Sequence, residues 1–192
     1  MSNLKTAIEA HFSESARVKA GLAAQSGAVL EIIQQLAGII TQGGRIYACG
    51  NGGSACDAMH FVEELVARYD RDRPGIPAQH LLDLGIITCW SNDYEFESVF
   101  SRQVETLVTN KDAIVVFSTS GNSANILKAM QSANLRGALV VGLLGKGGGK
   151  AKELAKLSLV VDSASTAHIQ ESHIALVHVI CAGIQDILYP TR

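Results

Sequence analysis

Apolar and polar positions alternate with helical spacing over the first 43 residues of the chain. The apolar positions are four apart within each half of the first stretch, with a weak point at Ser15; they are Leu4, Ile8, Phe12, Val18 and Leu22. A second, wider apolar face runs over 28–42 and stops at Gly43-Gly44. This spacing predicts two amphipathic helices, over 3–23 and 28–42, with a break at Ser26-Gly27.

This helical pair precedes every predicted strand, which is unusual for an α/β domain. The composition adds to the picture, because only 18% of the 192 residues are charged, against about 25% in an average soluble domain. We therefore expect residues 1–43 to pack against another subunit, and the protein to form an oligomer.

From residue 44 onward, short apolar runs of strand length alternate with helical segments. The expected strands are 45–49, 78–82, 113–117, 138–144 and 157–161. The expected helices are 54–69, 96–109, 123–134 and 167–188, with a short one after Gly149, whereas 85–91 fits neither pattern. Strands that alternate with helices form parallel sheets covered on both faces. The sequence thus predicts one domain over 1–192, whose α/β core (44–192) is a three-layer sandwich around a five-stranded parallel sheet.

Composition also bears on several classes of function. The net charge is −2 and no basic block occurs, so nucleic acid is not an expected partner. The four cysteines are far apart and form no CxxC pair, which indicates reduced thiols, used mostly for packing, in a cytoplasmic protein. The N-terminus lacks the apolar core of a signal peptide, and no run of about 18 apolar residues predicts a membrane span.

The stretch Gly50–Glu64 carries the first candidate site. It begins as a turn after the strand 45–49 and continues as a helix; the turn consists of Gly50, Asn51, Gly52, Gly53 and Ser54. Glycines let the backbone approach a ligand, and the first N–H groups of a helix have no partner within it. We expect an anion site here, with Ser54 at the N-cap position. His60 and Glu64 share one face of the same helix and suit a metal or proton transfer.

The strand 113–117 leads into a second turn of the same kind. Its hydroxyl-bearing residues are Ser118, Thr119, Ser120 and Ser123. These hydroxyls can donate to a phosphate beside backbone N–H groups, without a lysine or arginine. Neither turn is a Walker loop or a GxGxxG motif, so no nucleotide cofactor is expected. The glycine-rich segment 145–149 is interpreted as an ordinary turn.

The helix 167–188 carries three histidines, at 168, 173 and 178. A buried histidine is more often a core residue than a ligand, and we interpret His173 in this way because it lies about 140° around the helix from His178. Gln170 and His178 are separated by about 12 Å along the axis, so they can border one pocket but cannot chelate an ion alone. Together with His60 and Glu64 they would form a mixed N/O set suited to Zn²⁺ or another divalent ion.

These stretches together resemble the SIS (sugar isomerase) family, and within it the phosphoheptose isomerases. The matching segments are GNGGSACDAMHFVEEL (50–65), RPGIPA (73–78), NDY (92–94), STSGNSANILKA (118–129) and IQESHIALVHVI (169–180). The resemblance implies a five-stranded parallel α/β/α sandwich and a homotetramer with sites at subunit interfaces. It implies interconversion of sedoheptulose 7-phosphate and D-glycero-D-manno-heptose 7-phosphate, an early step of nucleotide-activated heptose biosynthesis for lipopolysaccharide or a related glycoconjugate.

The resemblance also implies roles for individual residues. Glu64 and His178 match the acid/base pair, and in some members the positions of His60, Glu64, Gln170 and His178 bind zinc. The matches to the substrate site are Asn51, Gly52, Gly53, Ser54, Arg68, Asn92, Asp93, Ser118, Thr119, Ser120, Ser123 and Gln170. The roles fit the chemistry, because an aldose–ketose isomerase moves a proton between adjacent carbons through an enediol and needs a second group to shuttle protons between the oxygens.

Several positions depart from the family pattern. Gly85 stands where relatives carry a serine, Glu95 where a glycine follows the Asn-Asp-aromatic motif, and Ala167 where some relatives carry aspartate. These departures leave open an isomerase of another sugar phosphate. A second alternative is a tetrameric scaffold of this fold that binds the bacterial replication initiator, since such paralogues can retain the Glu64 and His178 positions.

Overall fold

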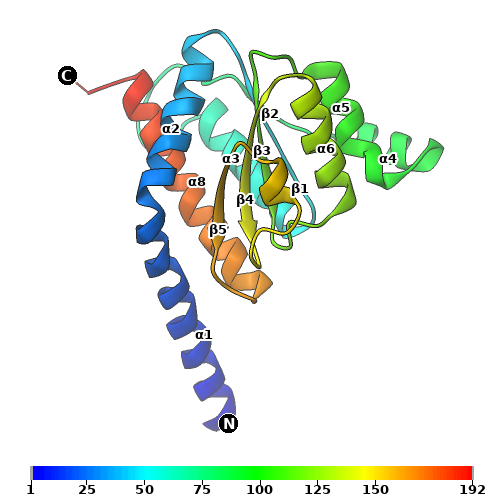
Figure 1. Cartoon of the computed structure of the whole chain (residues 1–192). Helices are drawn as coiled ribbons and strands as arrows, with labels where there is room; N and C mark the ends of the chain where they lie inside the picture. Colours follow the sequence, from blue (N-terminus) through cyan, green and yellow to red (C-terminus); the bar gives the residue numbers. More distant parts are fainter. Residues whose placement is uncertain (1, 192) are drawn as a thin grey trace.

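A computed structural model describes residues 2–191 of the chain, and a five-stranded parallel sheet lies at its centre (Figure 1). Its strands are β1 (Ile46–Gly50), β2 (Ala78–His80), β3 (Ala113–Ser118), β4 (Leu139–Gly145) and β5 (Leu157–Val161). All four strand pairings are parallel. The predicted fold class is therefore confirmed.

The strand order is β2-β1-β3-β4-β5, so the chain moves from β1 to one side of the sheet and later returns to the other side. In an open parallel sheet, ligands bind at such a reversal, outside the carboxyl ends of the two strands that flank it. The two candidate turns follow β1 and β3, which are neighbours with Gly50 opposite Phe117. The topology therefore brings both turns to the same crevice.

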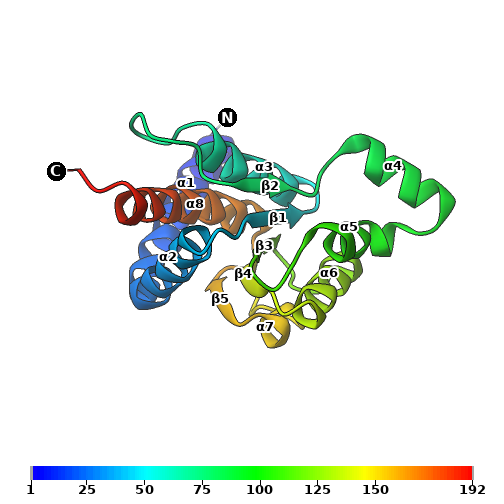
Figure 2. The ribbon, with the colours of Figure 1, turned by 90° about the horizontal axis from the view of Figure 1, so that it is seen from above.

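Helices cover both faces of the sheet (Figure 2). One layer contains α2 (Ser26–Thr41), α3 (Gly53–Val66) and α8 (Thr166–Leu188), and the other contains α5 (Val99–Leu107), α6 (Ala124–Leu135) and the short α7 (Ala151–Leu154). Side chains of β3 alternate between the layers: Val115 and Phe117 join the core with α3 and α8, whereas Ile114 and Val116 join the core with α5 and α6. A strand buried on both faces explains the unbroken apolar run.

The N-terminal helices differ from the prediction in where they break. Helix α1 (Ser2–Gly21) passes into a 3₁₀ turn (Leu22–Gln25), and α2 starts at Ser26, so Ser26-Gly27 begins a helix and does not interrupt one. Helix α1 projects beyond the body of the molecule (Figure 1). Leu4 and Phe12 are 68% and 69% exposed, whereas Val18 is buried, so only the N-terminal half of the apolar stripe of α1 is left uncovered by residues 2–191.

The ambiguous segment after β2 forms α4 (Leu84–Asp93), followed by a 3₁₀ turn (Phe96–Ser98). Asp83 caps α4 by accepting a hydrogen bond from the Ile86 amide at 2.9 Å. Helix α4 stands away from the body (Figure 2), and none of its residues is fully buried. Half-exposed residues give a weak periodic signal, which explains why the sequence pattern did not resolve this helix.

Helix α3 ends at Val66, three residues before the predicted end. The guanidinium of Arg73 donates to the carbonyls of Leu65 and Glu64 at 2.7 and 2.6 Å. The Leu65 carbonyl also accepts from the Ile76 amide at 2.9 Å, so the Arg73 side chain and the 73–76 segment together satisfy carbonyls at the helix terminus. A long-range cap of this kind has no local signature in the sequence.

Helix α8 is long and apolar enough, by length and composition alone, to cross a membrane, which the search for unbroken apolar runs did not anticipate. In the structure it packs against α2 and α3, and Leu176, Val177 and Ile180 lie in the core. We therefore interpret its apolar character as that of a core helix.

Candidate active site

The turn between β1 and α3 is built by glycines. A Cβ at Gly50 would lie 2.3 Å from the Ser54 carbonyl oxygen, so only glycine fits this close approach. Gly52 has φ +56° and is the N-cap of α3. The prediction that Ser54 is the N-cap is wrong. Ser54 lies in the first turn of α3, because Gly52, with its positive φ, takes the N-cap position two residues earlier,.

The two turns enclose one small polar cavity of about 50 Å³, lined by Asn51, Ser54, Phe117, Ser118, Thr119 and Ser123. None of these six residues is basic. The two turns, each predicted separately from the sequence as a candidate anion site, thus line one cavity. The N-terminus of α3 and three hydroxyls beside it offer donors suited to an anion.

Two side-chain amides, whose pairing the sequence did not predict, connect the two turns by hydrogen bonds. Asn51 Nδ2 donates to Asn125 Oδ1 at 2.8 Å, and Asn125 Nδ2 donates to Asn51 Oδ1 at 2.9 Å. Asn125 is only 3% exposed. The signal in the sequence is its spacing four residues before Ala129, which places an amide on the buried face of α6.

Two hydroxyls of the second turn also shape the loop. Ser118 Oγ accepts from the Gly121 amide at 3.0 Å, and Ser120 Oγ accepts from the Asn122 amide at 3.2 Å. Both O–H groups keep their capacity to donate to a ligand. The 145–149 segment is a turn, as interpreted, and it supports this loop because the Ala151 amide behind it donates to the Gly121 carbonyl at 2.9 Å.

A second group of predicted residues meets further along α3. His60 Nε2 lies 3.0 Å from Glu64 Oε1, and the rings of His60 and His178 are 5.2 Å apart. One ligand atom from each of His60, Glu64 and His178 falls within 4.8 Å of the others. The Glu64 side chain is only 14% exposed. Three converging N and O donors can hold a divalent ion or move protons.

Gln170, the fourth predicted ligand, lies against the first turn of α3. A Cβ at Gly53 would be 2.5 Å from Gln170 Nε2. Gly53 and His60 are seven residues apart, or about 10 Å along the helix. The structure therefore places Gln170 beside the anion cavity.

The cavity and the His60/Glu64/His178 cluster are well separated within one chain. Ser54 and Glu64 are ten residues apart on α3, which corresponds to about 15 Å. Arg68 is exposed and pairs with Asp72 at 3.1 Å. Asn92 and Asp93 lie at the exposed end of α4, where Asn92 Nδ2 donates to Asp93 Oδ1 at 2.9 Å. The structure thus does not bring these three predicted substrate residues to the cavity.

Beneath the site lies a buried pair, Asp57 of α3 and His173 of α8. His173 is fully buried as predicted, and its Nε2 lies 3.3 Å from the Leu144 carbonyl oxygen. Its Nδ1 faces Asp57 Oδ2 at 3.9 Å, and within residues 2–191 neither atom has a hydrogen-bond partner. The sequence signal that could have indicated a buried Asp57 is its spacing, four residues before Phe61 on the buried face of α3.

Burial dominates the titration of both groups. It raises the pKa of Asp57 to about 7, partly opposed by the charge of His60. It lowers the pKa of His173 to about 4, partly opposed by the hydrogen bond to Leu144. Both side chains are therefore neutral near pH 6.

The cysteines follow the packing prediction only in part. Cys49 and Cys181 are buried, whereas Cys56 and Cys89 are exposed, and all four are free thiols.

Comparison with known proteins identifies the family. The SIS domain family matches residues 11–145. The phosphoheptose isomerase of Campylobacter concisus is 43% identical over 95% of each chain, and that of Fusobacterium nucleatum is 42% identical over 83% of this chain and 82% of its own. The chain belongs to the phosphoheptose isomerases, within the SIS domain family.

The three-dimensional similarity to phosphoheptose isomerases is equally extensive. The structure of the Neisseria gonorrhoeae phosphoheptose isomerase superposes with a TM-score of 0.90 at 37% identity, over 95% of this chain and 99% of that one. The Francisella tularensis phosphoheptose isomerase gives a TM-score of 0.91 at 33% identity. The resemblance seen in the sequence is thus confirmed, and this phosphoheptose isomerase homologue is an aldose–ketose isomerase by family.

Proposed function

We propose that the protein interconverts sedoheptulose 7-phosphate and D-glycero-D-manno-heptose 7-phosphate. The observation that carries the proposal is the position of Glu64, which is mostly buried, 3.0 Å from His60 and grouped with His178. This arrangement supplies the carboxylate and the second proton-transfer group that an enediol mechanism needs.

The phosphate would occupy the cavity between the two turns. The hydroxyls of Ser118, Thr119 and Ser123 can donate to it together with the N-terminal amides of α3. A site without a basic side chain relies on directed hydrogen bonds and the helix dipole. Binding at this remote group fixes the sugar so that its reacting carbons meet the acid/base pair.

The reaction is a balanced transfer of two protons. Starting from the ketose, the Glu64 carboxylate takes a proton from C1 while the carbonyl oxygen at C2 receives one from His178, which gives the enediol. In the second half, Glu64 returns its proton to C2 and the C1 hydroxyl gives its proton to His178. No net oxidation occurs, and both residues return to their starting states.

We also propose a divalent ion, with zinc as the first candidate, at His60, Glu64 and His178. Their donor atoms suit it in type and spacing,. Gln170, the fourth predicted ligand, lies beside Gly53, about 10 Å along α3 from His60, so within one chain it is not part of this set. When bound, such an ion supplies Lewis-acid polarisation of the substrate carbonyl.

We propose a homotetramer in which the active site is completed between subunits. Three observations support this. The cavity and the Glu64 cluster are about 15 Å apart along α3 within one chain. Helix α1 exposes Leu4 and Phe12, and an apolar hollow of about 430 Å³ between α2 and α8 includes Val29, Ile33 and Leu176. We assign the enzyme to the cytoplasm and to an early step of activated-heptose supply.

The test is turnover of sedoheptulose 7-phosphate, followed by NMR, beside a panel of pentulose and hexulose phosphates. The proposal predicts that the heptulose phosphate is the best substrate. It predicts that Glu64→Gln abolishes turnover, whereas Glu63→Gln, an exposed neighbour on the same helix, does not. Absence of heptulose turnover with zinc supplied would contradict the proposal, and preference for another ketose phosphate would support the alternative isomerase.

A further inference from the structure

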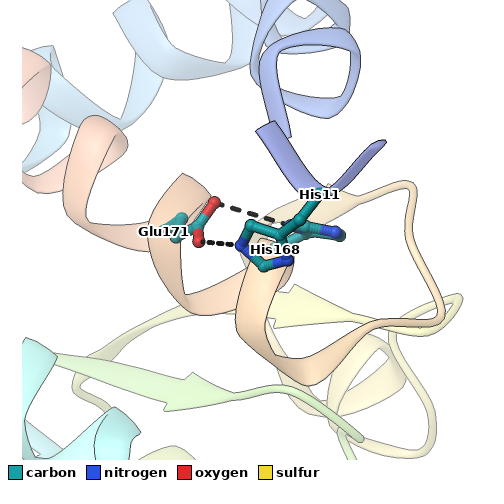
Figure 3. A group of neighbouring side chains, drawn as sticks. All are labelled: His11, His168 and Glu171. Atoms are coloured by element: carbon teal, nitrogen blue, oxygen red, sulfur yellow. Dashed lines mark hydrogen bonds and ion pairs between the residues drawn. The ribbon is translucent and has the colours of Figure 1, made fainter. Parts of the chain in front are cut away.

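A second cluster of metal-ligating side chains lies where α1 crosses the beginning of α8 (Figure 3). His11 comes from α1, and His168 and Glu171 come from the first turns of α8. Glu171 and His178 are seven residues apart, about 10 Å along the helix. The cluster is therefore distinct from the candidate active site, and it is not among the segments that match the family pattern apart from Glu171.

The spacing of the donor atoms fits a metal ion. His11 Nε2 lies 3.3 Å from Glu171 Oε1, and His168 Nδ1 lies 3.5 Å from Glu171 Oε2. In a tetrahedral site with bonds of about 2.1 Å, neighbouring ligand atoms lie roughly 3.4 Å apart. One ligand atom from each of the three residues falls within 4.8 Å of the others, so a small rotation of the exposed His11 ring closes the set.

His168 provides an independent observation. Its side chain is only 8% exposed, and its Nδ1 makes no hydrogen bond within residues 2–191 although it points toward the Glu171 carboxylate, as Figure 3 shows. A buried ring nitrogen that faces a carboxylate oxygen at 3.5 Å without a hydrogen bond is poorly satisfied, and a cation between the two atoms would pair with both,. Access exists from the other side, because the His11 side chain is 47% exposed.

The side chains around Glu171 favour its ionised carboxylate, which is the form that binds a metal ion. The Ser15 hydroxyl donates to Glu171 Oε2, and this bond, with the nearby His168 and His11 side chains, holds the pKa of Glu171 below its ordinary value. A hydrogen bond that orients a ligating carboxylate is a common outer-shell feature of metal sites. Lys19 Nζ, 3.8 Å from Glu171 Oε2, competes with a metal ion for this carboxylate, and binding the ion must displace it.

We propose that His11, His168 and Glu171 form a second divalent-metal site, of the zinc class, that joins α1 to α8. Two imidazoles and one carboxylate are a ligand set that zinc prefers, with water in the fourth position. An ion here fixes the angle of α1, which carries the exposed apolar stripe. It also anchors the turn of α8 from which Gln170 reaches Gly53.

The test is the number of zinc ions bound per chain, measured by equilibrium dialysis of the metal-free protein and elemental analysis. His11→Ala should bind one zinc fewer than the wild type. The matched control His80→Ala, a histidine outside both clusters, should bind as many as the wild type. The result rests on the difference between variants, so it is independent of whether the active site also binds zinc. Equal zinc content in His11→Ala and wild type would overturn the proposal.

A second variant tests the same site without removing a ligand. Lys19→Gln removes the competing cation and should lower the dissociation constant of this zinc by several-fold. Circular dichroism verifies that each variant is folded, which is expected because the His11 and Lys19 side chains are 47% and 42% exposed and neither is in the core. An unchanged dissociation constant in Lys19→Gln would show that zinc does not bind beside Glu171.

Discussion

Replacing Asp57 by asparagine should change the pH dependence of stability in a defined direction. Burial raises the pKa of Asp57 from 3.8 to about 7. The folded protein therefore binds this proton more tightly than the unfolded chain, and stability falls as pH rises between those values. For His173 the sign is opposite: its pKa is lowered from 6.5 to about 4, so stability rises with pH over that interval.

The magnitudes follow from about 1.4 kcal/mol for each pKa unit. Between about pH 5 and pH 8, ionisation of Asp57 lowers the free energy of unfolding by roughly 2.5 kcal/mol, and the His173 contribution raises it by roughly 2 kcal/mol. The two contributions nearly cancel in the wild type. In Asp57→Asn only the His173 contribution is left. The free energy of unfolding of the variant should therefore be roughly 2 kcal/mol higher at pH 8 than at pH 5.

The assay is urea-induced unfolding followed by circular dichroism at both pH values, at fixed protein concentration and with a chelator present. Any packing defect of the asparagine is the same at both pH values and cancels in the comparison, as do the other titrating groups. A variant whose stability changes with pH as the wild type does would refute the buried Asp57–His173 pair as described.

Three further predictions test the loops and the oligomer. Gly121→Ala should destabilise the protein by more than about 1 kcal/mol, because φ is +63° and the new Cβ would lie 1.9 Å from a backbone oxygen. The control Gly27→Ala, at a position with open space around it, should not destabilise the protein. Equal urea midpoints for the two variants would contradict the prediction. Asn125→Ala should weaken sugar-phosphate binding about tenfold, or ~1.4 kcal/mol, in calorimetry, whereas unchanged affinity would remove the amide pair from the site. Phe12→Ser should shift the sedimentation profile toward smaller species, whereas Leu135→Ser, at an 89% exposed leucine outside the N-terminal helices, should not; two identical profiles would exclude α1 from the interface.

The sequence predicted best what local pattern decides. Strands buried on both faces, such as β3, are unbroken apolar runs, and helices such as α8 show their boundaries within a residue or two. The pairing of His60 with Glu64 follows from helical spacing alone. The rule for parallel sheets places both turns at the carboxyl edge of the sheet. Their meeting at one cavity depends on β1 and β3 being neighbours, which the strand order shows.

Contacts between segments far apart in the chain could not be predicted from the sequence. The Asn51–Asn125 pair depends on β1 and β3 being neighbours, and the His11–Glu171 contact depends on the angle at which α1 crosses α8. Ser54 was misplaced as a cap because the backbone at Gly52 adopts a positive φ that no residue pattern specifies. Segment α4 was ambiguous because its side chains are only partly covered.

The most direct test of the central claim is solvent exchange during turnover. We would incubate the protein with sedoheptulose 7-phosphate in deuterated water and follow deuterium at C2 of the aldose product by NMR. While the enediol is bound, the proton on Glu64 can exchange with solvent before it returns to C2, so the mechanism predicts partial deuterium at C2 with wild type and with Glu63→Gln. Glu64→Gln should give neither product nor label. Product formed at the wild-type rate by Glu64→Gln, with the same label, would contradict the assignment of Glu64 as the catalytic base.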